Sequence, residues 1–202
     1  WDSPYPAGQT SLRPTGIASQ LQSVIFSLKS FVMAIGKSMM ATTRNRIKRI
    51  GDLVAAIFLG VALAPLLLAI SIVVATVQGR PIFFVQVRPG KDGKPFKVYK
   101  FRTMVSGGKH STEAGDLSRT TQLGRYLRLT SIDELPQLVN ILRGQMSFVG
   151  PRPLLEGYLP QYTPHQSKRH LVRPGLTGLA QVNGRKELTW EQKLEMDVYY
   201  VE

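Results

Sequence analysis

The chain has 202 residues, 43% of them hydrophobic, and this length allows one domain of ordinary size or two small ones. It contains no cysteine, which excludes a disulfide framework, a cysteine-ligated zinc site and a thiol nucleophile, and its three histidines argue against a histidine-rich metal site. With 26 lysines and arginines against 13 acidic residues, the formal net charge of +13 indicates an anionic partner, which could be nucleic acid, an anionic lipid surface or a phosphorylated substrate.

The first 45 residues form a region of their own, with an origin that the sequence leaves open. Residues 1–16 are rich in proline and glycine and predict an irregular arm. From Ile17 to Ile35 apolar residues recur at three- and four-residue steps, which predicts an amphipathic helix. This helix has no acidic residue, so it fits a membrane surface, and it fits a soluble core equally well. The chain starts at Trp1 without a signal peptide of the usual layout, so we expect a processed or excerpted chain.

The segment Leu53–Val77 is uncharged over 25 residues and predicts a membrane helix. A straight helix of this length would measure about 37 Å, enough to cross a hydrocarbon core of about 30 Å. Pro65 lies in the middle of the segment and lacks the N–H that would bond to the Val61 carbonyl. We therefore expect the helix to bend at Ala64–Pro65.

Basic residues flank this segment on both sides, within residues 44–49 and 80–94. The positive-inside rule places such flanks in the cytoplasm, and a re-entrant helix, which returns to the side it entered from, satisfies both ends. A kinked spanning helix is the alternative, since single prolines are tolerated in such helices.

Residues 80–202 have the pattern of a soluble domain. Two β-prone runs, Phe83–Val87 and Phe96–Phe101, predict a short hairpin around a glycine-containing loop. The polar residues 103–120, rich in glycine and serine, predict a mobile loop. Helical patterns follow at residues 122–129, 133–143, 153–170 and 189–201.

Two adjacent carboxylates precede an apolar helical pattern. The spacing of Ser131 and Glu134 matches a capping box, which would give Glu134 a purely structural role. Asp133 has no such explanation. A carboxylate kept ionised near a helix start could act as a nucleophile or bind a divalent cation.

Several arginines stand next to proline or glycine, or close to the carboxylate pair. Arginine binds phosphate oxygens with two donors at once, and a fixed backbone lowers the entropic cost of doing so. Together they favour a phosphate-rich ligand; they are Arg128, Arg152, Arg173 and Arg185. A Walker loop, a dinucleotide fingerprint and a nucleophile elbow are all missing from the sequence, which argues against an ATPase, a dinucleotide enzyme and a serine hydrolase.

Four longer strings stand in order along the chain: KVYKFRTM (97–104), SIDELPQ (131–137), MSFVGPRP (146–153) and RPGLTGLAQVNGR (173–185). Together they resemble the bacterial sugar transferase family, the monotopic phosphoglycosyl transferases. The resemblance covers roughly residues 46–202. Members of this family usually continue past the point that corresponds to Glu202, so we expect a further C-terminal helix outside this chain.

The resemblance implies a Mg²⁺-dependent enzyme at the cytoplasmic face of the bacterial inner membrane. It would transfer a sugar 1-phosphate from a UDP-sugar to a polyprenyl phosphate such as undecaprenyl phosphate, releasing UMP, as the first membrane step of glycoconjugate synthesis. It also implies a catalytic Asp133–Glu134 pair. Asp133 would attack the β-phosphorus to form a covalent intermediate and would also be the metal ligand.

The resemblance further implies roles for basic residues and for the helix break. Arg128 would lie near the lipid or transferring phosphate, with Arg152 and Arg185 near the nucleotide diphosphate. Lys100, Arg102 and Arg173 would also bind substrate, and their alternative role is contact with anionic headgroups. The family's re-entrant helix breaks at a Ser-Pro or similar step, which here is Ala64–Pro65.

We therefore expect a monotopic membrane protein, mainly α-helical with a small β-hairpin, a re-entrant helix broken at a proline and interfacial amphipathic helices. Its regions would be residues 1–45, the membrane helix with its basic flank at 46–79, and the catalytic domain at 80–202. The lipid bilayer would be its partner, and nucleic acid is not expected. The rival hypothesis is a non-catalytic basic membrane anchor that binds anionic lipid or nucleic acid and needs no Asp133. The sequence leaves the sugar, the glycan pathway and the oligomeric state open.

Overall fold

The computed structural model describes residues 43–105, 119–184 and 187–202. Contacts divide the chain into two compact units, Trp1–Lys48 and Arg49–Glu202. The predicted arm at 1–16 and the predicted amphipathic helix Ile17–Ile35 lie outside the described residues, as does most of the predicted mobile loop. All elements that build the candidate site belong to the second unit.

The apolar segment forms two helices joined at a sharp bend, called the bent pair below. One helix spans Thr43–Ala62, the next, α2, spans Ala64–Gln78, and the angle between them is 61°. Pro65 lies in the first turn of α2, where its missing N–H costs no helical hydrogen bond. The bend expected at Ala64–Pro65 is confirmed. In the part of the chain that the structure describes, no single helix is long and apolar enough to cross a membrane, whereas the bent pair as a whole meets that test of length and composition.

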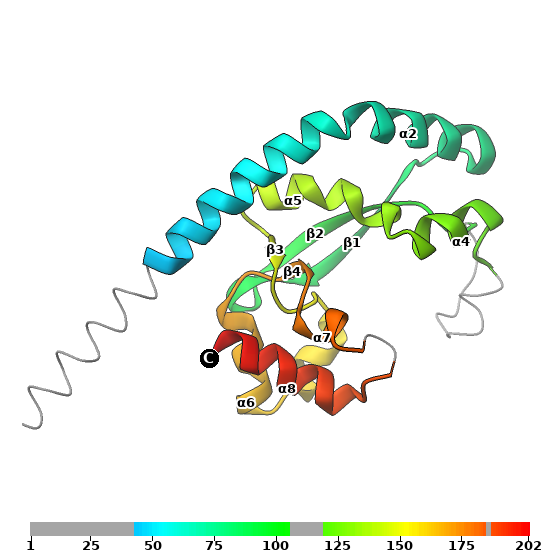
Figure 1. Cartoon of the computed structure of the whole chain (residues 1–202). Helices are drawn as coiled ribbons and strands as arrows, with labels where there is room; N and C mark the ends of the chain where they lie inside the picture. Colours follow the sequence, from blue (N-terminus) through cyan, green and yellow to red (C-terminus); the bar gives the residue numbers. More distant parts are fainter. Residues whose placement is uncertain (1–42, 106–118, 185–186) are drawn as a thin grey trace, which may run out of the picture. The chain divides into compact units, whose positions relative to one another are not determined.

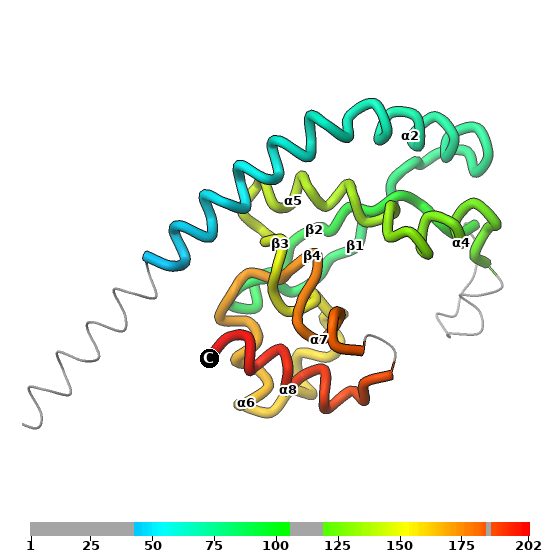
Figure 2. Tube along the Cα trace, viewed as in Figure 1, coloured from blue at the N-terminus to red at the C-terminus, as the bar shows by residue number. Residues whose placement is uncertain are grey.

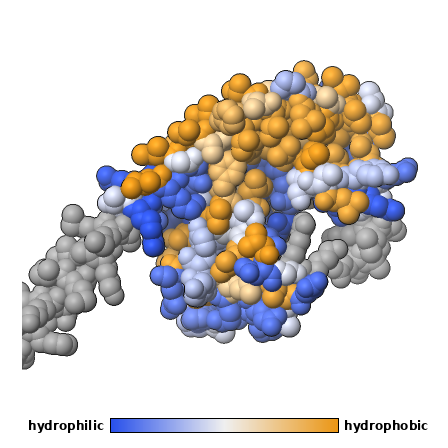
Figure 3. All heavy atoms as spheres, viewed as in Figure 1, coloured by the Kyte–Doolittle hydropathy of each residue, from blue (hydrophilic) through white to orange (hydrophobic). Residues whose placement is uncertain are grey.

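The bent pair presents a broad apolar surface (Figure 3). Large apolar side chains on both of its helices are more than half exposed, including Ile50, Phe58, Val61, Leu68, Ile72 and Val77. Soluble monomers rarely expose a continuous apolar patch of this extent, so the surface marks a contact with a membrane or another apolar partner.

An antiparallel hairpin lies beneath the bent pair in Figure 1. Strand β1 (Phe83–Pro89) pairs with β2 (Pro95–Phe101), and a short 3₁₀ turn, η1 (Lys91–Gly93), connects them. Gly93 has a φ of 71°, a conformation that glycine adopts without strain. The predicted hairpin with a glycine-containing loop is confirmed.

Three helical elements follow the hairpin: α4 (Gln122–Leu129), the 3₁₀ helix η2 (Ile132–Gln137) and α5 (Leu138–Leu142). The helix predicted at 122–129 is confirmed. The continuous helix predicted at 133–143 is wrong over its first half, because Pro136 has no N–H to donate and the backbone there takes the tighter 3₁₀ form.

A second small sheet was not predicted. Strands β3 (Ser147–Val149) and β4 (Gly175–Thr177) pair in parallel, so residues far apart in the sequence lie side by side. Gly175 allows this approach, because a Cβ atom there would lie 2.2 Å from the Gly150 nitrogen. The pairing brings the GPRP and RPGLTG segments together.

The single helix predicted at 153–170 is also wrong. Three short elements replace it: η3 (Glu156–Gln161), α6 (Pro164–Ser167) and η4 (Lys168–Leu171). Pro160 and Pro164 explain the breaks between them.

The chain then forms α7 (Leu179–Val182) and α8 (Trp190–Val201). Helix α8 confirms the helix predicted at 189–201 and begins with a capping box at Thr189. It packs against α7, α6 and η4 (Figure 2). The expected class, mainly helical with a small hairpin, is confirmed, with the β3–β4 sheet in addition.

Two apolar cores attach the bent pair to the rest of the second unit. Ala56 in the first helix packs into a core with residues of β2 and α5, and Val74 in α2 packs into a core with Phe101 and Leu127. The domain is therefore built directly onto both helices of the pair.

Polar contacts reinforce the first helix. Arg49 donates to the carbonyls of Ile141 at 2.6 Å and Leu142 at 3.1 Å, at the end of α5. Asp52 accepts from the Ser147 hydroxyl at 2.8 Å and from the Phe148 N–H at 3.2 Å. These polar contacts fix the orientation of the helix on the domain, in addition to its apolar packing.

Candidate active site

The adjacent carboxylates Asp133 and Glu134 lie in the first turn of η2, directly after Ser131. Ser131 adopts a left-handed conformation with a φ of 57°, and its side chain makes no cap hydrogen bond. The predicted capping box is therefore wrong, because the left-handed residue turns the chain too sharply for the box geometry. The side chain of Glu134 has its partners elsewhere in the fold.

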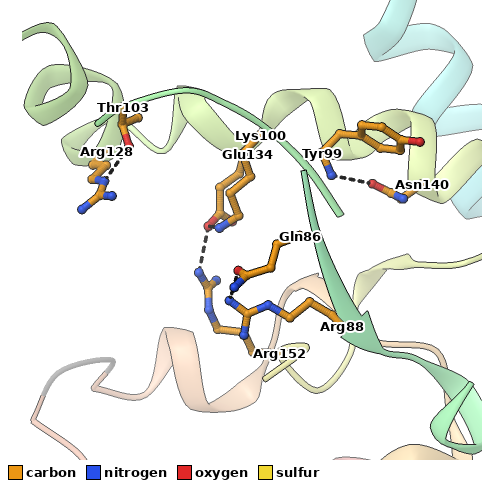
Figure 4. A network of polar contacts seen from close by, with 9 residues as sticks. All are labelled: Gln86, Arg88, Tyr99, Lys100, Thr103, Arg128, Glu134, Asn140 and Arg152. Atoms are coloured by element: carbon orange, nitrogen blue, oxygen red, sulfur yellow. Dashed lines mark hydrogen bonds and ion pairs between the residues drawn. The ribbon is translucent and has the colours of Figure 1, made fainter. Parts of the chain in front are cut away.

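Glu134 is bound by two cations from separate elements (Figure 4). Its Oε1 atom accepts from Lys100 Nζ on β2 at 2.7 Å and from Arg152, between β3 and η3, at 2.8 Å. The Glu134 side chain is 15% exposed. Burial alone would raise its pKa, but Arg152 and Lys100 outweigh burial and lower the pKa to about 2. Glu134 is therefore an ionised carboxylate at neutral pH, with its Oε1 atom bound by two cations.

Asp133 has a different environment from its neighbour. It is buried, with 8% of its surface exposed. Burial raises the pKa of Asp133, the nearby charge of Glu134 acts in the same direction, and Lys100 and Arg128 oppose them. Two adjacent carboxyl groups thus have their pKa values shifted in opposite directions, a pattern typical of catalytic pairs.

Arg128 reaches the pair from α4. Its Nε atom donates to the Thr103 hydroxyl at 3.0 Å, just after β2. The close approach of α4 to this segment requires Gly124, because a Cβ atom there would lie 2.0 Å from the Thr103 carbonyl oxygen. The guanidinium is otherwise exposed and available to an anion beside Asp133.

The buried side chain of Asn140 positions β2, and with it Lys100. Asn140 donates to the Lys97 carbonyl at 2.6 Å and accepts from the Tyr99 N–H at 3.4 Å. Because these bonds hold the part of β2 directly before Lys100, the Lys100 side chain projects toward Glu134 from a fixed strand.

The structure places the other predicted binding residues away from this pair. Arg102 is buried and donates to the carbonyls of Gln78, Gly79 and Arg80 at the end of α2, at 2.7 Å for Gly79. Arg173 donates to the Gly144 carbonyl at 2.8 Å, beyond the end of α5. Both bonds satisfy carbonyls at or just beyond helix ends, which gives these arginines a structural role. Arg185 lies outside the described residues.

A cleft of about 70 Å³ opens beside Glu134, and it reveals a residue that the sequence did not single out. Arg88 at the end of β1 lines it, together with Lys100, Glu134 and Arg152. The register pairs Phe84 with Lys100 and Gln86 with Val98, so Arg88 falls on the same face of the hairpin as Lys100. Correct strand pairing was the signal that could have identified it.

The carboxylates present fit a hydrated magnesium ion better than a fully protein-bound one. Within residues 43–105, 119–184 and 187–202, no group of three or more His, Cys, Asp or Glu side chains could hold a metal. Mg²⁺ commonly takes one or two carboxylates and completes its coordination with water and substrate phosphates. Glu134 is engaged by cations, which leaves Asp133 as the group that would hold it.

Comparison with protein families shows which family contains this site. The model of the bacterial sugar transferase family matches residues 43–202. The chain belongs to the bacterial sugar transferase family. The resemblance of the four sequence strings is thereby confirmed.

Named relatives fall in the same group. The chain is 52% identical to the uncharacterized sugar transferase EpsL of Bacillus subtilis, over 77% of this chain and 78% of that protein. It is 41% identical to the UDP-glucose:undecaprenyl-phosphate glucose-1-phosphate transferase of Klebsiella pneumoniae, over 76% of this chain and 36% of that protein. It is 34% identical to the undecaprenyl-phosphate galactose phosphotransferase of Salmonella typhimurium, over 89% of this chain and 41% of that protein. The chain thus spans less than half of the latter two relatives.

Proposed function

We propose that this chain transfers a sugar 1-phosphate from a UDP-sugar to undecaprenyl phosphate and releases UMP. The observation that carries the proposal is the Asp133–Glu134 pair, with opposite pKa shifts, beside a cleft lined by basic residues on a domain built onto an apolar bent pair. The names of the relatives support both substrates. They specify glucose in one relative and galactose in the other, so we assign no sugar.

Asp133 is the better nucleophile of the two carboxylates. Glu134 gives electron density to two cations, whereas burial makes the Asp133 carboxylate more basic once it is ionised. In the proposed reaction an Asp133 oxygen forms a bond to the β-phosphorus, and UMP departs with the electrons of the bond that breaks. An oxygen of the lipid phosphate then attacks the same phosphorus and releases the Asp133 carboxylate.

The cations supply the electrostatics of this reaction. Phosphoryl transfer depends mainly on alignment and on neutralisation of charge. The charge of Arg128 acts on Asp133, and Lys100 and Arg152 bind Glu134. Glu134 acts as the fixed anion that holds these two cations in place. A Mg²⁺ ion, when bound through Asp133, would neutralise the diphosphate of the donor.

We further propose that the bent pair is re-entrant and that the domain lies at the cytoplasmic face of the bacterial inner membrane. Helix α2 has 15 residues, about 22 Å, which is too short to cross alone. Arg49 binds one helix of the pair to the domain and Arg102 binds the end of the other. Attachment of both ends to one domain favours a path that returns to the same side.

The test is UMP release by the full chain in nanodiscs, with a panel of UDP-sugars, undecaprenyl phosphate and Mg²⁺. We expect Asp133→Asn and EDTA each to abolish UMP release. The matched control is Asp92→Asn, the same chemical change at an exposed carboxylate in the hairpin turn, and it should retain wild-type turnover.

Wild-type turnover by Asp133→Asn would refute the covalent mechanism. Absence of UMP with every donor, in a folded sample, would instead favour the basic membrane anchor.

A further inference from the structure

Two guanidinium groups face the same cleft from different parts of the chain. Figure 4 shows Arg88, from β1, and Arg152, from the segment after β3, with their charged ends close together below Glu134. Arg152 donates to Glu134. Arg88 donates to the neutral side chain of Gln86 at 2.6 Å, and no carboxylate of the described ranges forms an ion pair with it.

The cleft consequently has an excess of positive charge. Its lining contains three cations, Arg88, Lys100 and Arg152, and one carboxylate, Glu134. Burial lowers the pKa of Arg88, and the positive charge of Arg152 lowers it further. The two charged guanidinium groups therefore repel each other. An anion with two negative charges would relieve this repulsion. The diphosphate of a UDP-sugar carries one negative charge on each phosphate, and a phosphate monoester such as UMP or the lipid phosphate carries roughly one and a half to two at neutral pH.

Both phosphate-bearing substrates could supply that charge, and the fold favours the nucleotide. Arg128 lies on α4, whose Leu127 packs with Val74 of the bent pair. In Figure 4 the charged ends of Arg88 and Arg152 lie below Glu134, whereas the cyan ribbon of the bent pair passes above it. The cleft of Arg88 lies on the Glu134 side, next to Pro153 and Leu154 of the segment that leads to η3. A lipid phosphate stays at the membrane surface, whereas a nucleotide can bind on the side away from it.

We propose that Arg88 and Arg152 together clamp the α-phosphate of the nucleotide, the group that leaves as the phosphate of UMP. This assignment rests on the proposed function and adds Arg88 as a substrate-binding residue. Arg88 is the clamp's uncompensated charge, since Glu134 already balances Arg152. Two guanidinium groups from separate parts of the chain offer several N–H donors to the oxygens of one phosphate.

The test is equilibrium binding to the detergent-solubilised full chain in buffer with Mg²⁺. UMP is the probe, uridine is the probe without phosphate, and farnesyl phosphate is a lipid phosphate monoester. We expect Arg88→Gln to weaken UMP binding about tenfold or more and to leave uridine and farnesyl phosphate binding unchanged. Arg88→Lys keeps the positive charge but lacks the paired N–H donors of the guanidinium, so it should recover part of the lost affinity for UMP. Arg125→Gln, at an exposed position on α4, is the matched control and should bind UMP like wild type.

Wild-type affinity of Arg88→Gln for UMP would overturn the clamp. The clamp would also be overturned if both Arg88 variants lost affinity for UMP and for uridine to the same extent. A loss of affinity for farnesyl phosphate alone would overturn it too. Binding of UMP needs no turnover, so this result is independent of the Asp133 test of the reaction.

Discussion

The ion pairs of Glu134 should contribute to stability in a pH-dependent way. Glutamine has the same shape as glutamate without the charge. Glu134→Gln therefore leaves Lys100 and Arg152 without the counter-charge of a carboxylate that is itself only 15% exposed. We expect the variant to be less stable than wild type at neutral pH and the difference to shrink in acid.

The magnitude follows from the shift in pKa. The Glu134 carboxyl goes from 4.5 to about 2, and one pKa unit corresponds to about 1.4 kcal/mol. The stabilisation is thus about 3 kcal/mol. Because the folded-state pKa is depressed, this contribution is complete above the unfolded value of 4.5 and is lost as the pH falls toward about 2. Linkage predicts that more than half is lost at about pH 3.

The assay is guanidinium unfolding of the two proteins in mild detergent, at neutral pH and at about pH 3. The control is Glu156→Gln, which removes an exposed carboxylate on η3 and should shift stability little at either pH. A difference between wild type and Glu134→Gln that does not change between the two pH values would refute the proposed ion pairs, as would equal stability at neutral pH.

Two further predictions concern the support of the site and the membrane helix. The buried pair of Arg169 and Asp197 has side chains 1% and 5% exposed, and Arg169 also donates to the Arg152 carbonyl at 2.7 Å. Asp197→Asn should cost about 3–5 kcal/mol in unfolding free energy and should raise KM for the UDP-sugar more than it lowers kcat, since Arg152 loses its backbone support; an unchanged KM in initial-rate measurements would contradict this. Pro65→Ala should straighten the bent pair and allow some chains to span, so that a cysteine introduced near residue 45 reacts from the periplasmic side; absence of labelling would count against Pro65 as the determinant of topology.

Local signals in the sequence were sufficient for several parts of the fold. Pro65 cannot continue a helix whichever neighbours surround it, and the bend lies where its missing N–H predicts. The hairpin of β1 and β2 and the helix α8 also follow from patterns within a few residues. At Pro136, Pro160 and Pro164 the apolar periodicity alone predicts continuous helices, whereas the prolines break them into shorter elements.

The family, the position of the bend and the adjacency of Asp133 and Glu134 can all be predicted from the sequence, because each depends on residues that are neighbours in the chain. Which groups face these carboxylates depends on the folded arrangement of distant segments. Lys100 and Arg152 reach Glu134 from 34 and 18 residues away. Arg102 and Arg173 are held by backbone carbonyls, and Arg88 enters the cleft through strand register. A basic residue in a sequence shows its charge, whereas its role depends on which carbonyl, carboxylate or open cleft the fold brings within hydrogen-bonding distance.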